Sequence, residues 1–200
     1  TINVFAFVLA LALTRKIKGT NLFRTVFFMP NLIGGIILGY IWQQMINAVL
    51  LKYETTLVAN PTYGFWGLVI LMNWQMIGYM MIIYVAGLQN VPTDLIEAAE
   101  IDGATFLQKV RYIVFPLCKP TTLFLLVTGI IRSFQVFMNA YMMTGGGPDN
   151  NTTMIGLLIF NNAFTYGKYG LACAQAIILA LVIGLLTMLQ FKVMGDDIEY

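Results

Sequence analysis

Long apolar runs separated by short polar segments dominate this chain of 200 residues. Four runs, at residues 25–46, 64–87, 121–143 and 170–191, reach the roughly 20 residues that a helix needs to cross a hydrocarbon core about 30 Å thick. A fifth run, at residues 2–13, is apolar but too short to span alone. The pattern predicts an all-α, polytopic membrane helix bundle that forms a single domain over residues 1–200.

Details within these runs predict how the helices pack. The second run is expected to be kinked and tightly packed because it contains Pro30, Gly34, Gly35 and Gly39. The last run has a small residue at every fourth position, which predicts close approach by a neighbouring helix: Ala172, Ala176, Ala180 and Gly184. Residues 154–166 are too few to span and are expected to form an outer-leaflet or re-entrant helix. Because the chain begins inside an apolar run without a methionine, we expect it to be N-terminally truncated.

Composition supports a bilayer as the solvent and excludes several classes of site. The chain is 59% hydrophobic and 10% charged, with a mean hydropathy of +0.79, whereas globular proteins carry about 25% charged residues. Its net charge of +2 is small and dispersed, which argues against nucleic acid as a partner. Without histidine, and with Cys118 and Cys173 expected at opposite membrane edges, we expect no metal site. The glycines at 145–147 precede Pro148 rather than the lysine of a phosphate loop, so nucleotide chemistry is expected to belong to another chain.

The distribution of lysine and arginine predicts the orientation in the membrane. Successive loops contain four, one, three, one and one basic residues: Arg15, Lys16, Lys18 and Arg24; Lys52; Lys109, Arg111 and Lys119; Lys168; and Lys192. Short loops rich in these residues remain cytoplasmic. We therefore expect the loop at residues 92–116 and the C-terminus to face the cytoplasm.

The charged stretch at residues 97–116 is predicted to form two short helices outside the lipid. Asp94 and Thr105 are expected to cap them, each with a glutamate or glutamine three residues later. Gly103 is expected to take the left-handed conformation that ends the first helix, and Pro116 to end the second. The acidic and apolar positions of the first helix fall on different arcs. From the pattern alone, this piece is either an interfacial helix on the inner leaflet or a docking surface for a partner.

The same stretch resembles the cytoplasmic motif of ABC importer permeases. The matching positions are Glu97, Ala98, Ala99, Gly103, Ile113 and Pro116, and Phe115 replaces the leucine usual in the family. Three further segments resemble the carbohydrate-uptake group of this family, which includes the maltose-transport membrane subunits: LFRTVFFMPNLIGG with Trp42 downstream, AGLQNVPTDLIEAAEIDGA, and TGGGPDNNTTM with Phe160, Phe164, Tyr169 and Gly170. Together they cover nearly the whole chain in the expected order, and only the family's N-terminal helix is absent.

The resemblance implies the type I ABC importer permease fold and the partners of that family. It implies a coupling loop, residues 92–116, seated in a cytoplasmic ATPase dimer that binds ATP and Mg²⁺, while this chain holds no cofactor. The implied coupling residues are Glu97, Ala98, Ala99, Asp102, Gly103, Ile113 and Pro116. A second permease subunit, an extracytoplasmic solute-binding protein and a sugar substrate are also implied, in the cytoplasmic membrane. The binding protein is expected to contact Gly145, Gly146, Gly147 and Pro148, although these residues also suit a plain turn.

Polar side chains inside two apolar runs are candidates for the translocation path. Amide, hydroxyl and aromatic groups suit sugars, and the runs contain Asn73, Trp74, Gln75, Tyr79, Arg132, Ser133, Phe134, Gln135, Phe137, Asn139 and Tyr141. From these we select Asn73, Trp74, Tyr79, Arg132, Ser133, Gln135 and Phe137. By resemblance, Tyr79 and Ser133 match sugar contacts of the maltose permease. Arg132 is expected near mid-span, either binding sugar hydroxyls or a phosphate, or forming a salt bridge or carbonyl clamp.

Three alternatives to a sugar permease remain open. A permease for a related solute such as glycerol-3-phosphate would give Arg132 an anion to bind. A stand-alone channel would not need the capped cytoplasmic segment. An intramembrane enzyme would need paired acids, a histidine–cysteine arrangement or a metal set within the spans, and the sequence contains none of these there.

Overall fold

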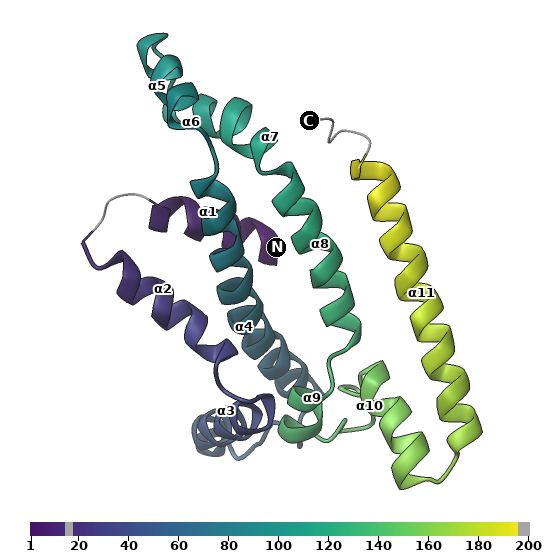
Figure 1. Ribbon diagram of the computed structural model, residues 1–200. Coiled ribbons are helices and arrows are strands. Elements are labelled where there is room, and N and C mark those ends of the chain that lie inside the picture. The colour runs from purple at the N-terminus through teal and green to yellow at the C-terminus, as the bar shows by residue number, and fades with distance from the viewer. Residues whose placement is uncertain (15–17, 196–200) are drawn as a thin grey trace.

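The computed structural model describes residues 1–14 and 18–195, and in this part of the chain the regular structure is helical (Figure 1). Its first half contains α1 (Ile2–Thr14), α2 (Thr20–Phe28), the short 3₁₀ helix η1 (Met29–Asn31), α3 (Gly35–Leu50), η2 (Leu51–Tyr53) and α4 (Pro61–Gln89). Its second half contains α5 (Thr93–Ile101), α6 (Phe106–Lys109), η3 (Val110–Val114), α7 (Phe115–Leu117), α8 (Lys119–Phe134), α9 (Met138–Met143), α10 (Ile155–Phe160), η4 (Asn161–Thr165) and α11 (Tyr169–Gly195). Both η3 and η4 are π-helical turns. The predicted all-α class is confirmed.

Two predicted spans are single helices. α4 contains 29 residues and α11 contains 27, and both are long and apolar enough to cross a membrane. α4 begins where Asn60 caps it, because the Asn60 side chain accepts a hydrogen bond from the Thr62 N–H at 2.9 Å and Pro61 occupies the first turn. The short helix predicted at residues 154–166 is also present, as α10 and η4.

The span predicted at residues 25–46 is wrong as a single helix. α2 and η1 end at Asn31, and α3 continues at an angle of 98°. Pro30 lies in η1, where its missing N–H and fixed φ favour a break, and Gly34 is extended rather than helical. The predicted kink is therefore confirmed, and it is sharp enough that α3 does not continue the direction of α2 (Figure 1).

The span predicted at residues 121–143 is also divided. α8 ends at Phe134, residues 135–137 are not helical, and α9 forms a separate short helix. The helical segment from α6 through α7 ends at Leu117, one residue beyond the end predicted at Pro116. The bend comes instead at Cys118, where the helical segments before and after it meet at 67°. Arg132 consequently lies in the last turn of α8 rather than at mid-span.

Two apolar clusters lie at the two ends of α4. One joins α1 to α4 and to the start of α8, and its buried members include Ala6, Ala10, Met80, Tyr84 and Cys118. The other joins α3, α9 and α10 to the first half of α4, and its buried members include Leu38, Leu68, Leu71, Met143 and Leu157. The stretch of α4 between these clusters, at residues 72–75, is therefore the place where polar side chains can point inward.

Glycines allow the closest helix crossings. A Cβ atom added at Gly78 of α4 would lie 1.8 Å from the Phe27 carbonyl oxygen of α2. One added at Gly39 of α3 would lie 3.0 Å from the Met142 Cβ of α9. The tight packing predicted around Gly39 is confirmed, whereas the larger constraint at Gly78 was not predicted.

Most of the small-residue stripe of α11 meets no neighbouring helix in the described part of this chain, so close approach by another helix stays a prediction. Ala172 is buried, but Ala176 and Ala180 are exposed, and a Cβ at Gly184 would meet nothing within 4 Å. Only 6% of the apolar window of α11 is buried. The reason is that, among the described residues, α11 packs mainly on α8, α10 and η4, which leaves its other faces uncovered (Figure 1).

The two ends of the bundle differ in character. Figure 1 shows α5 and α6 at the same end as the C-terminal turns of α11, and α3, α9 and α10 at the other end. The loop at residues 144–153 joins α9 to α10 and so belongs to this second end. This agrees with the loop at residues 92–116 and the end of α11 lying on the same side, while the assignment of that side to the cytoplasm stays a prediction.

Candidate functional site

At one end of the bundle, α5 and α6 form a bracket with a fixed turn. Gly103 has a φ of +77°, as predicted for the residue that ends α5. Its N–H donates to the Glu100 carbonyl at 3.1 Å, and the Ala104 N–H donates to the Ala99 carbonyl at 2.9 Å. These two bonds are the pair that defines a Schellman motif, which satisfies carbonyls at a helix end. The direction of α6 relative to α5 is thereby set by backbone hydrogen bonds.

The second helix of the bracket has the predicted cap, and the first does not. The Gln108 N–H donates to Thr105 Oγ1 at 3.4 Å, and the Thr105 N–H donates to Gln108 Oε1 at 2.7 Å, which forms a capping box. α5 instead begins after Pro92, which makes no side-chain hydrogen bond. Asp94 is wrong as the cap because it already lies in the first turn, where its charge suits the helix dipole. An ion pair between Lys109 and Glu100 ties the two helices together.

The tip of the bracket exposes apolar as well as charged side chains. Ile101 is 88% exposed and Leu107 is 76% exposed, beside the exposed Glu97. Figure 1 shows α5 projecting beyond the ends of α4 and α8. Such a combination on a rigid projection suits contact with another protein.

The structure distributes the predicted coupling residues over two parts of this end. Those at the tip are exposed, apart from a partly buried alanine: Glu97, Ala98, Ala99, Asp102 and Gly103. Ile113 and Pro116 belong to the stem formed by η3 and α7, where Ile113 is partly buried. The helical segment from α6 through α7 then meets α8 at the Cys118 bend, so the bracket is linked to α8 by the chain itself.

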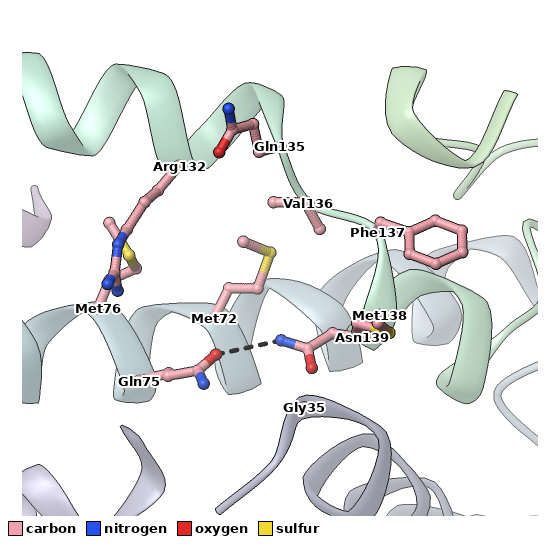
Figure 2. A pocket seen from close by; sticks show the side chains of 10 residues that line it. All are labelled: Gly35, Met72, Gln75, Met76, Arg132, Gln135, Val136, Phe137, Met138 and Asn139. Atoms are coloured by element: carbon pink, nitrogen blue, oxygen red, sulfur yellow. Dashed lines mark hydrogen bonds between the residues drawn. The ribbon is translucent and has the colours of Figure 1, made fainter. Parts of the chain in front are cut away.

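α8 ends at a cavity of about 430 Å³ that lies between the two apolar clusters (Figure 2). Its lining comes from α3, α4, the end of α8 and the start of α9: Gly35, Met72, Gln75, Met76, Arg132, Gln135, Val136, Phe137, Met138 and Asn139. The lining combines one cation, three amides and three methionines. A polar solute can be bound there by hydrogen bonds, with methionine side chains covering its apolar faces.

Arg132 is held over an aromatic ring at this cavity. Its guanidinium carbon lies 3.9 Å from the centroid of the Tyr79 ring, well within the distance of a cation–π contact. A basic side chain in the last turn of α8 also suits the negative end of the helix dipole. The Tyr79 ring therefore contacts the guanidinium group, which carries five N–H donors.

An amide chain lines the opposite side of the cavity. The Asn139 Nδ2 group donates to Gln75 Oε1 at 3.2 Å, and the Asn31 Nδ2 group donates to the Gln75 carbonyl at 3.0 Å. Asn139 is 8% exposed, and its Oδ1 atom is buried without a hydrogen-bond partner. A buried acceptor of this kind is costly unless something donates to it. In Figure 2 this Oδ1 atom points toward Gly35, where an added Cβ would lie 3.5 Å from it, rather than toward Arg132.

The sequence-selected path residues divide into two groups. Arg132, Gln135 and Phe137 line the cavity. Tyr79 does not line it but contacts Arg132. Three others make contacts elsewhere: the Asn73 amide donates to the Val69 carbonyl at 2.7 Å, the Ser133 hydroxyl donates to the Gly129 carbonyl at 2.7 Å, and Trp74 packs on Trp42 at 5.4 Å. Gln75 and Asn139 were among the polar residues of the two runs but were not selected as path residues. Their positions, four residues from Tyr79 and from Gln135, could have identified them. The three methionines of the lining could not be identified from the sequence, because an apolar side chain does not stand out in an apolar run.

The loop at the other end of the bundle is built around side-chain hydrogen bonds. Gly145 and Gly146 both have positive φ. The Thr144 and Thr152 hydroxyls lie 2.7 Å apart, and the Thr152 hydroxyl donates to the Gly147 carbonyl at 2.9 Å. Such bonds fix the loop shape, which suits docking as well as turning. Whether this loop contacts a binding protein stays a prediction.

Comparison with known proteins gives a consistent pattern. The family model described as "binding-protein-dependent transport system inner membrane component" matches residues 2–199. A protein of Thermoanaerobacterium thermosulfurigenes, described as a probable starch degradation products transport system permease, is 42% identical over 94% of this chain and 68% of its own length. A multiple sugar-binding transport system permease of Streptococcus mutans is 33% identical over 94% of this chain and 68% of its own length. An sn-glycerol-3-phosphate transport system permease of Brucella suis is 34% identical over 98% of this chain and 70% of its own length.

The fold is shared with a solved transporter. A chain in the crystal structure of a bacterial ABC transporter involved in the import of the acidic polysaccharide alginate superposes with a TM-score of 0.82. It is 21% identical, and the match covers 98% of this chain and 73% of that chain. The predicted ABC importer permease fold is therefore confirmed.

Proposed function

Because this chain belongs to the family of binding-protein-dependent transport system inner membrane components, we propose that it carries a sugar or oligosaccharide across the cytoplasmic membrane. It would do so as one permease subunit of an ATP-driven importer. In this proposal the bracket and the C-terminus face the cytoplasm, and the loop at residues 144–153 faces outward. The chain performs no covalent chemistry and supplies a pathway and a coupling surface.

The observation that carries the proposal is the continuity between the bracket and the cavity. α6, η3 and α7 lead from the bracket to the Cys118 bend, and α8 leads from that bend to Arg132. A force applied to the exposed tip therefore reaches the cavity through helices, without an intervening flexible loop. A stand-alone channel has no use for a projecting, doubly fixed bracket of this kind.

The partners follow from what this chain would need. An ATPase dimer would receive the tip of the bracket around Glu97 and Gly103 and would itself bind ATP and Mg²⁺. A second permease subunit would cover part of the exposed α11 and complete the pathway. A solute-binding protein would deliver the sugar at the loop containing Gly145–Pro148.

Uptake measurements test the proposal. Cells expressing the complete importer would be given labelled sugars, with and without the ATPase and the binding protein. We expect uptake of at least one sugar that requires both partners. Uptake that continues at the same rate without the ATPase would contradict the proposal and favour a channel.

A second candidate substrate is glycerol-3-phosphate. Arg132 supplies a cation at the cavity, and one relative at 34% identity is named as an sn-glycerol-3-phosphate permease. The sugar is preferred because the cavity also contains three amides, which a small phosphate ester would leave largely unused. Including labelled glycerol-3-phosphate in the same uptake panel decides between the two.

A further inference from the structure

Four aromatic rings form a continuous series beside α9 and α10. The Phe137 and Tyr141 centroids are 5.6 Å apart, Phe137 and Phe160 are 4.9 Å apart, and Tyr141 and Phe160 are 5.7 Å apart. Phe164 continues the series at 5.1 Å from Phe160. Phe137, Phe160 and Phe164 line a second cavity of about 290 Å³. We call these four side chains the aromatic strip.

The aromatic strip begins where the polar cavity ends. Phe137 lines both cavities. Figure 2 shows its ring pointing away from Arg132 and Gln75, while its backbone borders the polar cavity. α10, which carries Phe160, lies at the end of the bundle opposite α5 (Figure 1). The strip therefore begins on the side of residue 137 that faces away from Arg132, and it lies at the end of the molecule where the solute would enter.

Packing within this chain does not require the exposed rings of the strip. α10 approaches residues 135–137 at Gly156, where a Cβ would lie 3.3 Å from the Val136 carbonyl oxygen. The fully buried Leu157 anchors the same helix in the apolar cluster. By contrast, Phe164 is 73% exposed and Tyr141 is 47% exposed. Rings that served only to hold α10 in place would be covered by that packing.

Resting on the proposed function, we propose that the aromatic strip binds successive rings of an oligosaccharide whose leading ring occupies the polar cavity. The C–H faces of a pyranose are apolar and stack on aromatic faces, while its hydroxyl groups stay hydrated or bind amides. Rings about one sugar unit apart provide repeated stacking positions along a chain. The substrate class is thus a saccharide of several rings, since a monosaccharide or glycerol-3-phosphate cannot reach from the polar cavity to Phe164.

Substitution of Phe164 tests this assignment because its exposure limits any structural cost. The complete importer, with ATPase and binding protein, would be reconstituted in proteoliposomes. Initial uptake of labelled disaccharides and tetrasaccharides would be measured at saturating loaded binding protein, using both neutral α-linked glucans and acidic β-linked oligosaccharides. In Phe164→Leu the ratio of tetrasaccharide to disaccharide uptake is expected to fall about fivefold, the value of one lost aromatic contact. Phe164→Trp is expected to keep the ratio within about twofold of the wild-type ratio.

The matched control is Tyr169→Leu, since Tyr169 is exposed to a similar degree, at 63%, and has no place in the strip. It is expected to leave the ratio unchanged. Equal loss of tetrasaccharide and disaccharide uptake in Phe164→Leu, or an unchanged ratio, would overturn the assignment while leaving the sugar-import proposal intact. A wild-type importer that takes up no saccharide but does take up glycerol-3-phosphate would overturn the proposed substrate, and the strip assignment with it.

Discussion

Replacing Gly103 with valine is the sharpest test of the bracket. A Cβ at this position would meet nothing within 4 Å, so the added Cβ itself causes no collision. The cost comes from the backbone, because φ is +77° and an L-residue pays about 1–2 kcal/mol in the left-handed region. A difference of 1.4 kcal/mol is about tenfold in an equilibrium constant, so the population of the native bracket should fall about 5- to 30-fold relative to other conformations.

The substitution series separates backbone strain from other effects. Asparagine tolerates the left-handed region better than alanine, and a β-branched residue tolerates it least. We therefore expect sugar uptake to fall in the order Gly103, Asn, Ala, Val, while the amount of protein in the membrane stays constant. The assay is ATP-dependent uptake in proteoliposomes containing the whole importer. Gly170→Val is the control, because it places the same side chain at another open glycine, at the start of α11 and outside its small-residue stripe.

Two results bear directly on the reasoning. Uptake by Gly103→Val equal to that of the wild type, at equal membrane amounts, would show that the bracket geometry does not transmit force. A similar loss in Gly170→Val would show that the assay responds to glycine replacement in general. Only a graded loss confined to Gly103 agrees with a backbone-fixed bracket.

Three further outcomes are expected. Glu97→Arg reverses an exposed charge at the tip, so uptake should be lost while the unfolding free energy changes by less than about 0.5 kcal/mol, as checked by thermal unfolding in detergent. Gly78→Ala places a methyl group against the Phe27 carbonyl and should destabilise the fold by about 1–3 kcal/mol or more in the same measurement, whereas Gly184→Ala should be nearly neutral. Arg132→Gln removes the cation of the cavity, so uptake of an anionic solute should fall at least about tenfold and uptake of a neutral sugar much less; equal losses for both would exclude a charge-selective role.

Local features of the sequence predicted much of the fold. The lengths of α4 and α11 depend only on uninterrupted apolar residues, and the turn at Gly103 and the capping box at Thr105 depend on residues within four positions. The bend at Cys118 and the gap at residues 135–137 were missed, because apolar runs remain apolar across a bend. The end of the helix before α8 was predicted at Pro116 and lies one residue later, because proline is tolerated within the first turn of a helical element such as α7.

The sequence predicted the kinds of residue that line the candidate cavity, but only some of the individual residues. Polar groups inside apolar runs stand out, and this signal found Arg132 and Gln135. Trp74 and Ser133 carry the same signal but do not line the cavity, since the face that a helix turns inward depends on its neighbours. The hydrogen bond between Asn139 and Gln75 joins residues 64 positions apart, so only the packing of α9 on α4 creates it.

The geometry of α8 shows how a small movement at the bracket can alter the cavity. α8 contains 16 residues, so at 1.5 Å per residue its far end lies about 24 Å from the Cys118 bend. A rigid tilt of about 5° would displace that end by about 2 Å by the same geometry. The Arg132 guanidinium now lies 3.9 Å from the Tyr79 ring, and a cation–π contact is lost beyond about 6 Å. A tilt of this size, directed away from Tyr79, would take the contact to its limit, which makes the state of the Arg132–Tyr79 pair depend on the position of the bracket.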